Sequence, residues 1–157
     1  MIKKNAEKNP RPSRKHHQVP VRVRRSRTGL GLFAEAPIRK DKFIIEYRGK
    51  RLLWNKVEDI WNKYLFEVNK RWAIDGSSRR NTARYINHSC SPNAVPYEVR
   101  GRIHIYARKN IHPGDEITYD YGREYFDELL QPIGCKCVAC AGPNLRKRSA
   151  KRRRRRR

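Results

Sequence analysis

The stretch that decides the fold reads NTARYINHSCSPN and spans residues 81–93. Its first five residues can form a short helical turn, whereas the polar, proline-containing run from Asn87 to Asn93 is typical of a loop. Apolar and β-branched residues that follow it predict strands over 94–99 and 103–108. We therefore expect a polar loop held between regular strands.

Strand patterns also fill most of the chain outside this stretch. Val19, Val21 and Val23 alternate with polar residues, and the glycines at 29 and 31 then break the run. Further strands are predicted over 43–47, 64–68, 71–75 and 116–121, with a hairpin turn at 69–70. Residues 52–62 carry apolar side chains at helical spacing, which predicts an amphipathic helix. The expected fold class is therefore mainly β with short helices.

Positive charge gathers at both ends of the chain. Of 39 Lys and Arg residues, six lie in 1–18 and ten in 144–157, so the segment between them contributes only +9 to the net charge of +24. Blocks of like charge do not bury themselves, and they bind polyanions. We expect a basic disordered tail at 1–18, an Arg-rich one at 144–157, and nucleic acid or another polyanion as their partner. The alternative is that they only solubilise or localise the protein.

The length of 157 residues suits one folded domain, for which a monomer is expected. No run approaches the roughly 18 apolar residues that a membrane span needs. The charged N-terminus is not followed by the apolar segment of a signal peptide. These features predict a protein without membrane attachment, in the nucleus or in a cytoplasmic nucleoid.

The order of short motifs is more specific than any single motif. GLGLFA at 29–34, EYRG at 46–49, YLFEV at 64–68 and IDG at 74–76 precede residues 81–93; GDEITYDYG at 114–122 and a cluster of cysteines follow them. In this order the chain resembles the SET-domain protein lysine methyltransferases with a post-SET zinc-binding cysteine cluster. The resemblance implies a SET catalytic domain over 19–125 and a post-SET zinc-binding segment over 126–143.

This resemblance implies several small β-sheets, on which segments 82–93 and 114–121 make a knot-like crossing, followed by a post-SET zinc loop. Distant residues would then share one site. S-adenosyl-L-methionine would be bound by Gly29, Leu30, Gly31, Asn87, His88 and Tyr121, with the backbone of His88 mattering more than its ring. Without the family context, the glycines mark only a tight turn.

The catalytic residues implied by the same resemblance are Tyr121, Tyr64 and Tyr119, around a narrow channel for the target lysine. Each would otherwise be interpreted as a packed core aromatic. An aromatic channel suits the chemistry, because lysine stays protonated up to a pH of about 10.4 and an apolar wall disfavours the ammonium. Tyrosine hydroxyls can orient the neutral amine. At position 119 the family has Phe or Tyr, and a hydroxyl there crowds the pocket.

The cysteines are candidates for a structural Zn²⁺ site. Cys135, Cys137 and Cys140 lie close together in sequence, and a structural zinc ion is bound by four ligands. The family draws one ligand from the Asn-His-Ser-Cys string, which implies Cys90 as the fourth. Only two residues separate Cys137 from Cys140, where the family commonly has four, so the loop is shorter here. Four reduced structural thiols are the alternative.

The expected function is therefore an S-adenosylmethionine-dependent protein-lysine N-methyltransferase. Its substrate would be a basic, nucleic-acid-associated protein, histone-like or ribosomal, to which the tails deliver the enzyme. Acidic residues at the channel mouth would then have to offset the basic core. One alternative is a degenerate SET-fold zinc protein that serves only as a nucleic-acid-binding module. Another is that the protein methylates its own tail.

Overall fold

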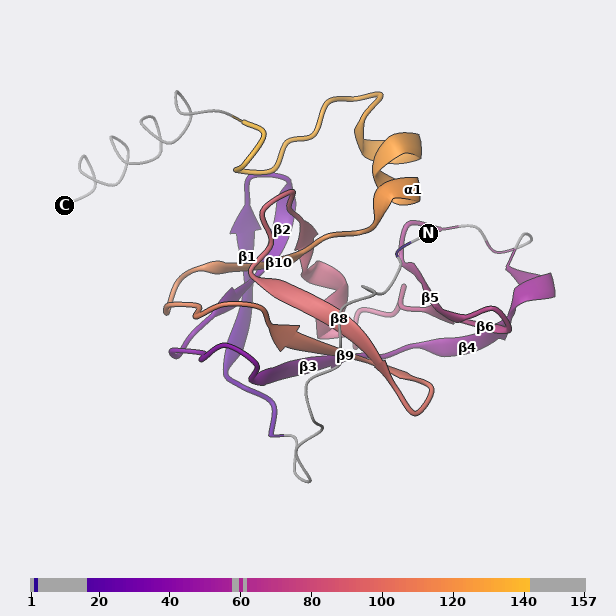
Figure 1. Cartoon of the computed structure of the whole chain (residues 1–157), viewed down its shortest axis with the longest axis horizontal. Coiled ribbons are helices and arrows are strands. Elements are labelled where there is room, and N and C mark those ends of the chain that lie inside the picture. The colour runs from indigo at the N-terminus through magenta and orange to yellow at the C-terminus, as the bar shows by residue number, and fades with distance from the viewer. Residues whose placement is uncertain (1, 3–16, 58–59, 61, 142–157) are drawn as a thin grey trace.

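The computed structural model describes residue 2, residues 17–57, residue 60 and residues 62–141 (Figure 1). Three small β-sheets make up the fold, and short helical turns connect them. The predicted fold class, mainly β with short helices, is thereby confirmed. Most of segment 1–18 and all of 144–157 lie outside the described residues, so the two disordered tails and the four-part division of the chain stay predictions.

The first sheet has the strand order β1 (Val21–Ser26), β2 (Gly29–Ala34), β10 (Glu116–Tyr119) and β7 (Asn87–His88). β10 pairs antiparallel with β2 and parallel with β7, which places the two motif segments side by side, as predicted. Asn93 extends this contact. Its side chain accepts a hydrogen bond from the Thr118 amide at 2.8 Å and donates one to the Glu116 carbonyl at 2.8 Å.

The other two sheets have three strands each. One has the order β3 (Phe43–Tyr47), β9 (Arg102–Ala107) and β8 (Ala94–Val99). The other has the order β4 (Lys50–Leu53), β6 (Trp72–Asp75) and β5 (Leu65–Asn69). β5 and β6 form the predicted antiparallel hairpin, with its turn at 70–71, one residue later than predicted, because Asn69 still pairs with Trp72. The strands expected at 43–47, 94–99 and 103–108 are confirmed as well.

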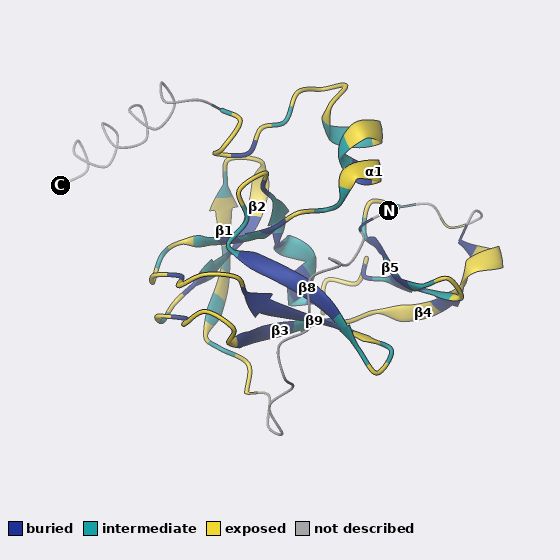
Figure 2. Cartoon of the chain, in the orientation of Figure 1, coloured by how far each residue is buried: buried dark blue, intermediate teal, exposed yellow. Residues whose placement is uncertain are grey.

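The hydrophobic core lies where the three sheets meet. Figure 2 shows β3, β8 and β9 almost entirely buried, in keeping with strands covered on both faces. Phe66 of the third sheet and Tyr119 of the first are both fully buried, with ring centroids 6.2 Å apart. Burying one such side chain contributes about 1.5–3 kcal/mol. The core therefore fixes Tyr119 rigidly at the end of β10.

The amphipathic helix predicted over 52–62 is wrong. Leu52 and Leu53 end strand β4, opposite Ala73 and Trp72. Among the described residues that follow, up to position 62, there are only short 3₁₀ turns, namely η1 (Trp54–Lys56) and a turn at Ile60. Residues 58, 59 and 61 lie outside the described residues. Leu52 and Val57 are buried in one small cluster with Leu65 and Ala73. Of the apolar side chains at helical spacing, Val57 is buried, whereas Leu53, Trp54 and Ile60 are exposed, so the spacing does not mark the buried face of a helix.

Short helical turns place the remaining segments. The turn predicted at 81–85 is confirmed as the 3₁₀ turn η3 (Thr82–Tyr85). After Gly122, the α-helical turn α1 (Arg123–Tyr125) continues into the π-helical turn η4 (Phe126–Leu130), which leads to the cysteine segment at the top of Figure 1. Within the described part of the chain, no helix has the length and hydropathy of a membrane span.

Candidate active site and metal centre

A cavity of about 660 Å³ opens between the β1–β2 turn, β7, the end of β10 and the C-terminal segment. Four separate stretches of chain bring most of the predicted site residues to its wall: Gly29, Leu30, Tyr64, Asn87, His88, Tyr119 and Tyr121. A cavity of this size holds a ligand the size of a cofactor. Gly31 is the one predicted cofactor residue that does not line it.

Several tyrosines line the cavity, among them Tyr119, Tyr121 and Tyr125. The hydroxyl of Tyr121 donates a hydrogen bond to the Ile86 carbonyl at 2.7 Å. The ring of Tyr121 lies 5.2 Å from that of Tyr119 and 4.9 Å from that of Tyr125. Burial raises the pKa of Tyr119 and of Tyr121 well above the usual value, so both hydroxyls stay protonated at neutral pH. They offer neutral oxygens in fixed positions to a polar group between them.

Tyr64 lines the cavity. Its backbone carbonyl is hydrogen-bonded, and two cations pack on its ring. Its carbonyl accepts a hydrogen bond from the Tyr47 hydroxyl at 2.8 Å. The Arg84 guanidinium lies 4.0 Å from its ring centroid and the Lys63 ammonium 5.2 Å. Burial alone would raise the pKa of Tyr64, but hydrogen bonding to Arg84 and the positive charges of Lys63 and Arg84 lower it overall. The rim here is electropositive.

Asn87 joins the β1–β2 hairpin to β7 through its side-chain amide. It donates to the Leu30 carbonyl at 3.0 Å and to the Glu116 carboxylate at 2.7 Å. Glu116 also accepts from the Ser26 hydroxyl at 2.8 Å. A Cβ on Gly31 would lie 2.4 Å from this carboxylate. Gly31 is therefore needed to make room for Glu116, and it supports the wall from behind.

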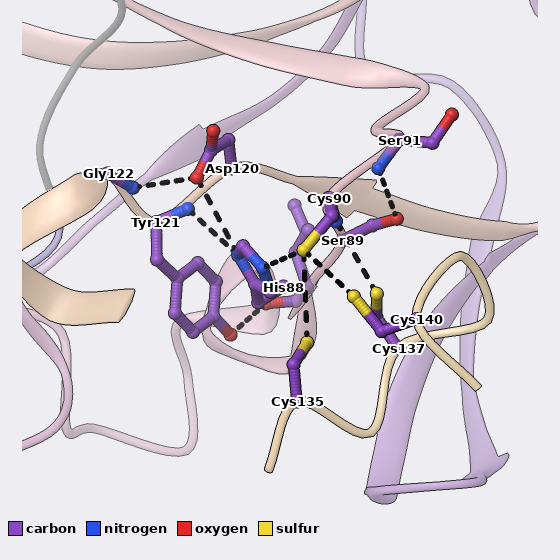
Figure 3. Close-up of polar contacts among 11 residues, drawn as sticks. His88, Ser89, Cys90, Ser91, Asp120, Tyr121, Gly122, Cys135, Cys137 and Cys140 are labelled. Carbon is purple, nitrogen blue, oxygen red and sulfur yellow. Dashed lines mark hydrogen bonds and ion pairs between the residues drawn. The ribbon is translucent and has the colours of Figure 1, made fainter. Parts of the chain in front are cut away.

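The His88 ring connects the cavity to the cysteines (Figure 3). Its Nδ1 accepts a hydrogen bond from the Tyr121 amide at 3.3 Å and lies 3.7 Å from the Asp120 carboxylate. Its Nε2 lies 3.3 Å from the Cys90 sulfur. Burial lowers the pKa of His88, against a smaller opposite effect of Asp120. The ring thus makes contacts of its own, in addition to the backbone pairing of His88 with Tyr119.

The four cysteines come together although Cys90 lies far from the others in sequence. Their sulfur atoms all lie within 4.8 Å of one another. The Cys90 sulfur is 3.3 Å from that of Cys140 and 3.9 Å from that of Cys135 (Figure 3). Tetrahedral zinc with Zn–S bonds of about 2.3 Å requires sulfur atoms about 3.8 Å apart. The donor set and its spacing fit a structural zinc ion, and the shortened loop between Cys137 and Cys140 reaches.

Backbone amides already favour one thiolate in this cluster. Burial raises the pKa of Cys137, but hydrogen bonds from the backbone of Cys90 and Cys140 outweigh it and lower the pKa to about 6. Burial and the neighbouring sulfurs raise the pKa of Cys90. A divalent cation among four such sulfurs would stabilise all of them as thiolates.

The part of the wall formed by the β1–β2 turn suits S-adenosyl-L-methionine. Gly29 has a φ of 119°, and no atom lies within 4 Å of the place where its Cβ would be, so the turn faces open space. The backbone can approach a ligand closely there. Arg27 and Lys136 also line the cavity and could offset the carboxylate of a bound amino acid group. The residues present therefore fit the cofactor.

Several residues line the cavity that the sequence did not predict as site residues: Tyr47, Lys63, Arg84 and Tyr125. Two signals could have pointed to them. Arg84 lies inside the deciding stretch, three residues before Asn87, and Tyr125 follows Tyr121 by one helical turn. Lys63 has no comparable signal, because exposed lysines are common in any sequence.

Comparison with known proteins shows to which family the chain belongs. A profile of the SET domain family matches residues 29–122. The chain is 38% identical over 128 residues to a histone-lysine N-methyltransferase of Schizosaccharomyces pombe that is specific for histone H3 lysine 4, covering 72% of this chain and 14% of that protein. It is 33% identical over 156 residues to a variant-silencing SET domain-containing protein of Plasmodium falciparum, covering 88% of this chain and 6% of that one.

The fold is found in solved structures too. In the crystal structure of the Chaetomium thermophilum polycomb repressive complex 2, one chain is similar with a TM-score of 0.63 and 28% identity, over 68% of this chain and 16% of that chain. This chain thus spans a small part of the length of each of these three proteins.

Proposed function

The chain belongs to the SET domain family, and we propose that it is an S-adenosylmethionine-dependent protein-lysine N-methyltransferase. The observation that carries the proposal is one cavity lined by two kinds of residue. The glycine turn, Asn87 and His88 contribute to its wall, and so does a group of tyrosines that includes Tyr64, Tyr119 and Tyr121. Cofactor and lysine would meet inside the protein.

When bound, S-adenosyl-L-methionine supplies an electrophilic methyl group on a sulfonium. The chain's own residues orient the amine that receives it. Because the Tyr121 hydroxyl gives its hydrogen to the Ile86 carbonyl, its oxygen lone pairs stay free to accept from the N–H groups of a neutral lysine amine. Tyr119 and Tyr64 form the walls beside it. Exclusion of water disfavours the ammonium form there, and so do the positive charges of Lys63 and Arg84 beside Tyr64.

A structural role for zinc completes the proposal. Cys90, Cys135, Cys137 and Cys140 would hold the ion, which would tie the C-terminal segment to β7 next to His88. Since Cys135 and Cys137 also line the cavity, the zinc loop would close its wall.

The substrate we propose is a lysine of a basic, nucleic-acid-associated protein, histone-like or ribosomal. Two features of the sequence support it: the net charge of +24 and the terminal arginine run, which can bring the enzyme to nucleic acid. The relatives named above include a histone-lysine N-methyltransferase. A monomer that acts in the nucleus or in a nucleoid is part of the same proposal.

The experiment incubates the purified chain with cofactor labelled in its methyl group and a mixture of histones and ribosomal proteins. Labelled lysine, identified by mass spectrometry, is the expected result, and label on the enzyme itself would reveal methylation of its own tail. Omission of the chain is the control. Tight binding of nucleic acid with no labelled protein and no bound cofactor would instead establish the alternative, a SET-fold module that only binds nucleic acid.

A further inference from the structure

Of the Lys, Arg, Asp and Glu residues that the structure describes, only Lys and Arg line the cavity. Arg27, Lys63, Arg84 and Lys136 line it, and no Asp or Glu among the described residues does. A channel that accepts a lysine from a basic segment would need carboxylates here to offset the substrate's charge. The wall offers cations instead.

The four cations fall into two pairs at different places. Arg27 and Lys136 also border a smaller neighbouring hollow of about 250 Å³, together with His88, Asp115 and Glu116. Arg27 belongs to the β1–β2 turn and Lys136 to the cysteine segment. Lys63 and Arg84 do not border this hollow and flank Tyr64 instead.

Of the two cations at Tyr64, Arg84 is held in place. Arg84 donates a hydrogen bond to the Ser77 carbonyl while its guanidinium packs on the Tyr64 ring, so its charge is fixed at the rim. Lys63 is exposed beside it. A fixed charge discriminates between partners better than a mobile one, because its side chain loses less conformational entropy when a partner binds.

One carboxylate on the neighbouring strand β6 is already engaged. Asp75 accepts hydrogen bonds from the Asn62 side chain at 3.2 Å and from the Ser77 amide at 3.0 Å, and it does not line the cavity. Glu58 and Asp59 lie outside the described residues. Within the described part, nothing at the cavity wall neutralises Lys63 and Arg84.

We propose that Lys63 and Arg84 select target lysines that are flanked by acidic residues; this inference rests on the proposed function. A glutamate or aspartate next to the target lysine gains an opposite charge at the rim, whereas a flanking arginine or lysine meets a like charge. The protein that carries the target can be basic as a whole. Its segment at the channel mouth is acidic.

The test uses peptides of equal length that contain a single lysine and differ in two residues on each side: all acidic, all neutral or all basic. We expect kcat/KM to be about tenfold higher for the acidic than for the basic peptide, which equals about 1.4 kcal/mol. Lys63→Glu should erase or invert this preference. The matched control is Lys70→Glu, the same charge change at an exposed position of the β5–β6 turn, outside the cavity.

Each outcome decides a different point. Equal kcat/KM for the three peptides in the wild-type protein would overturn the inference while leaving the methyltransferase proposal intact. An equal shift in Lys63→Glu and Lys70→Glu would also overturn it, because net charge rather than the rim would then set the preference. If neither these peptides nor any protein mixture accepts methyl groups, the proposed function itself fails.

Discussion

Replacing Tyr121 by Phe removes one hydroxyl and leaves the ring in place. In the structure this hydroxyl donates to the Ile86 carbonyl at 2.7 Å, and the ring packs on Tyr119 and Tyr125. The substitution therefore keeps the aromatic packing. The substitution deletes one positioned hydroxyl oxygen from the group of tyrosines that line the cavity.

The structure sets the size of two separate effects. Losing a hydrogen bond of this kind costs about 0.5–1.5 kcal/mol of unfolding free energy. For a domain of this size that lowers the melting temperature by roughly 2–8 °C, so Tyr121→Phe stays folded. Loss of one preorganised polar group in an active site lowers turnover on the order of 10²–10³-fold. Catalysis should thus suffer far more than stability.

The assay follows methyl transfer by mass spectrometry, cofactor affinity by calorimetry and unfolding by circular dichroism. Tyr97→Phe is the matched control, because it deletes the hydroxyl of a buried tyrosine in a separate cluster with Phe43, Val95 and Tyr106. We expect kcat to fall only in Tyr121→Phe, with cofactor affinity within about twofold of wild type. Unchanged turnover would refute the reasoning, and so would an equal loss in both variants.

The remaining predictions concern the metal, the hairpin and the tail. Elemental analysis should find one zinc per chain, lost alike in Cys90→Ser and Cys137→Ser, because three thiolates leave the site open; protein purified without chelators that holds no metal would exclude the site. Gly31→Ala should lower the unfolding free energy by about 1–3 kcal/mol in a denaturant titration, since its Cβ would meet the Glu116 carboxylate at 2.4 Å; wild-type stability would show that this carboxylate moves freely. Deleting residues 144–157 removes ten positive charges and should weaken nucleic-acid binding and flatten its salt dependence, with peptide methylation unchanged. A full salt slope after truncation would mean that the arginine run makes no phosphate contact.

The local pattern of residue types predicted the positions of most strands. The β5–β6 hairpin and the strands around 43–47 and 94–107 follow from runs of β-branched and aromatic residues bounded by turn residues, which act between near neighbours. The same reasoning failed at 52–62. There, Leu52 is buried because β4 pairs with β6, and this pairing is invisible in a helical periodicity.

The candidate site was predicted as a set of residues but not as an arrangement. The motif order assigned cofactor, catalytic and metal residues to one region, and nine of them line a single cavity, Cys135 and Cys137 included. It assigned Gly31 to the cofactor, whereas the structure places it against Glu116. A sequence motif records which residue types are needed together, but not which of them face the ligand and which support the wall.

By itself the sequence determined the mainly β class, the SET-domain resemblance and the candidate cysteine ligands, because residue types and their spacing are enough for each. Only the tertiary structure decided that Lys63 and Arg84 flank Tyr64, that Glu116 ties Asn87 to the β1–β2 hairpin, and that Cys90 meets the distant cysteines. Each of these contacts depends on how separate sheets pack around a shared core. That packing is a balance of burial and hydrogen bonding over the whole domain, so no local stretch of sequence contains it.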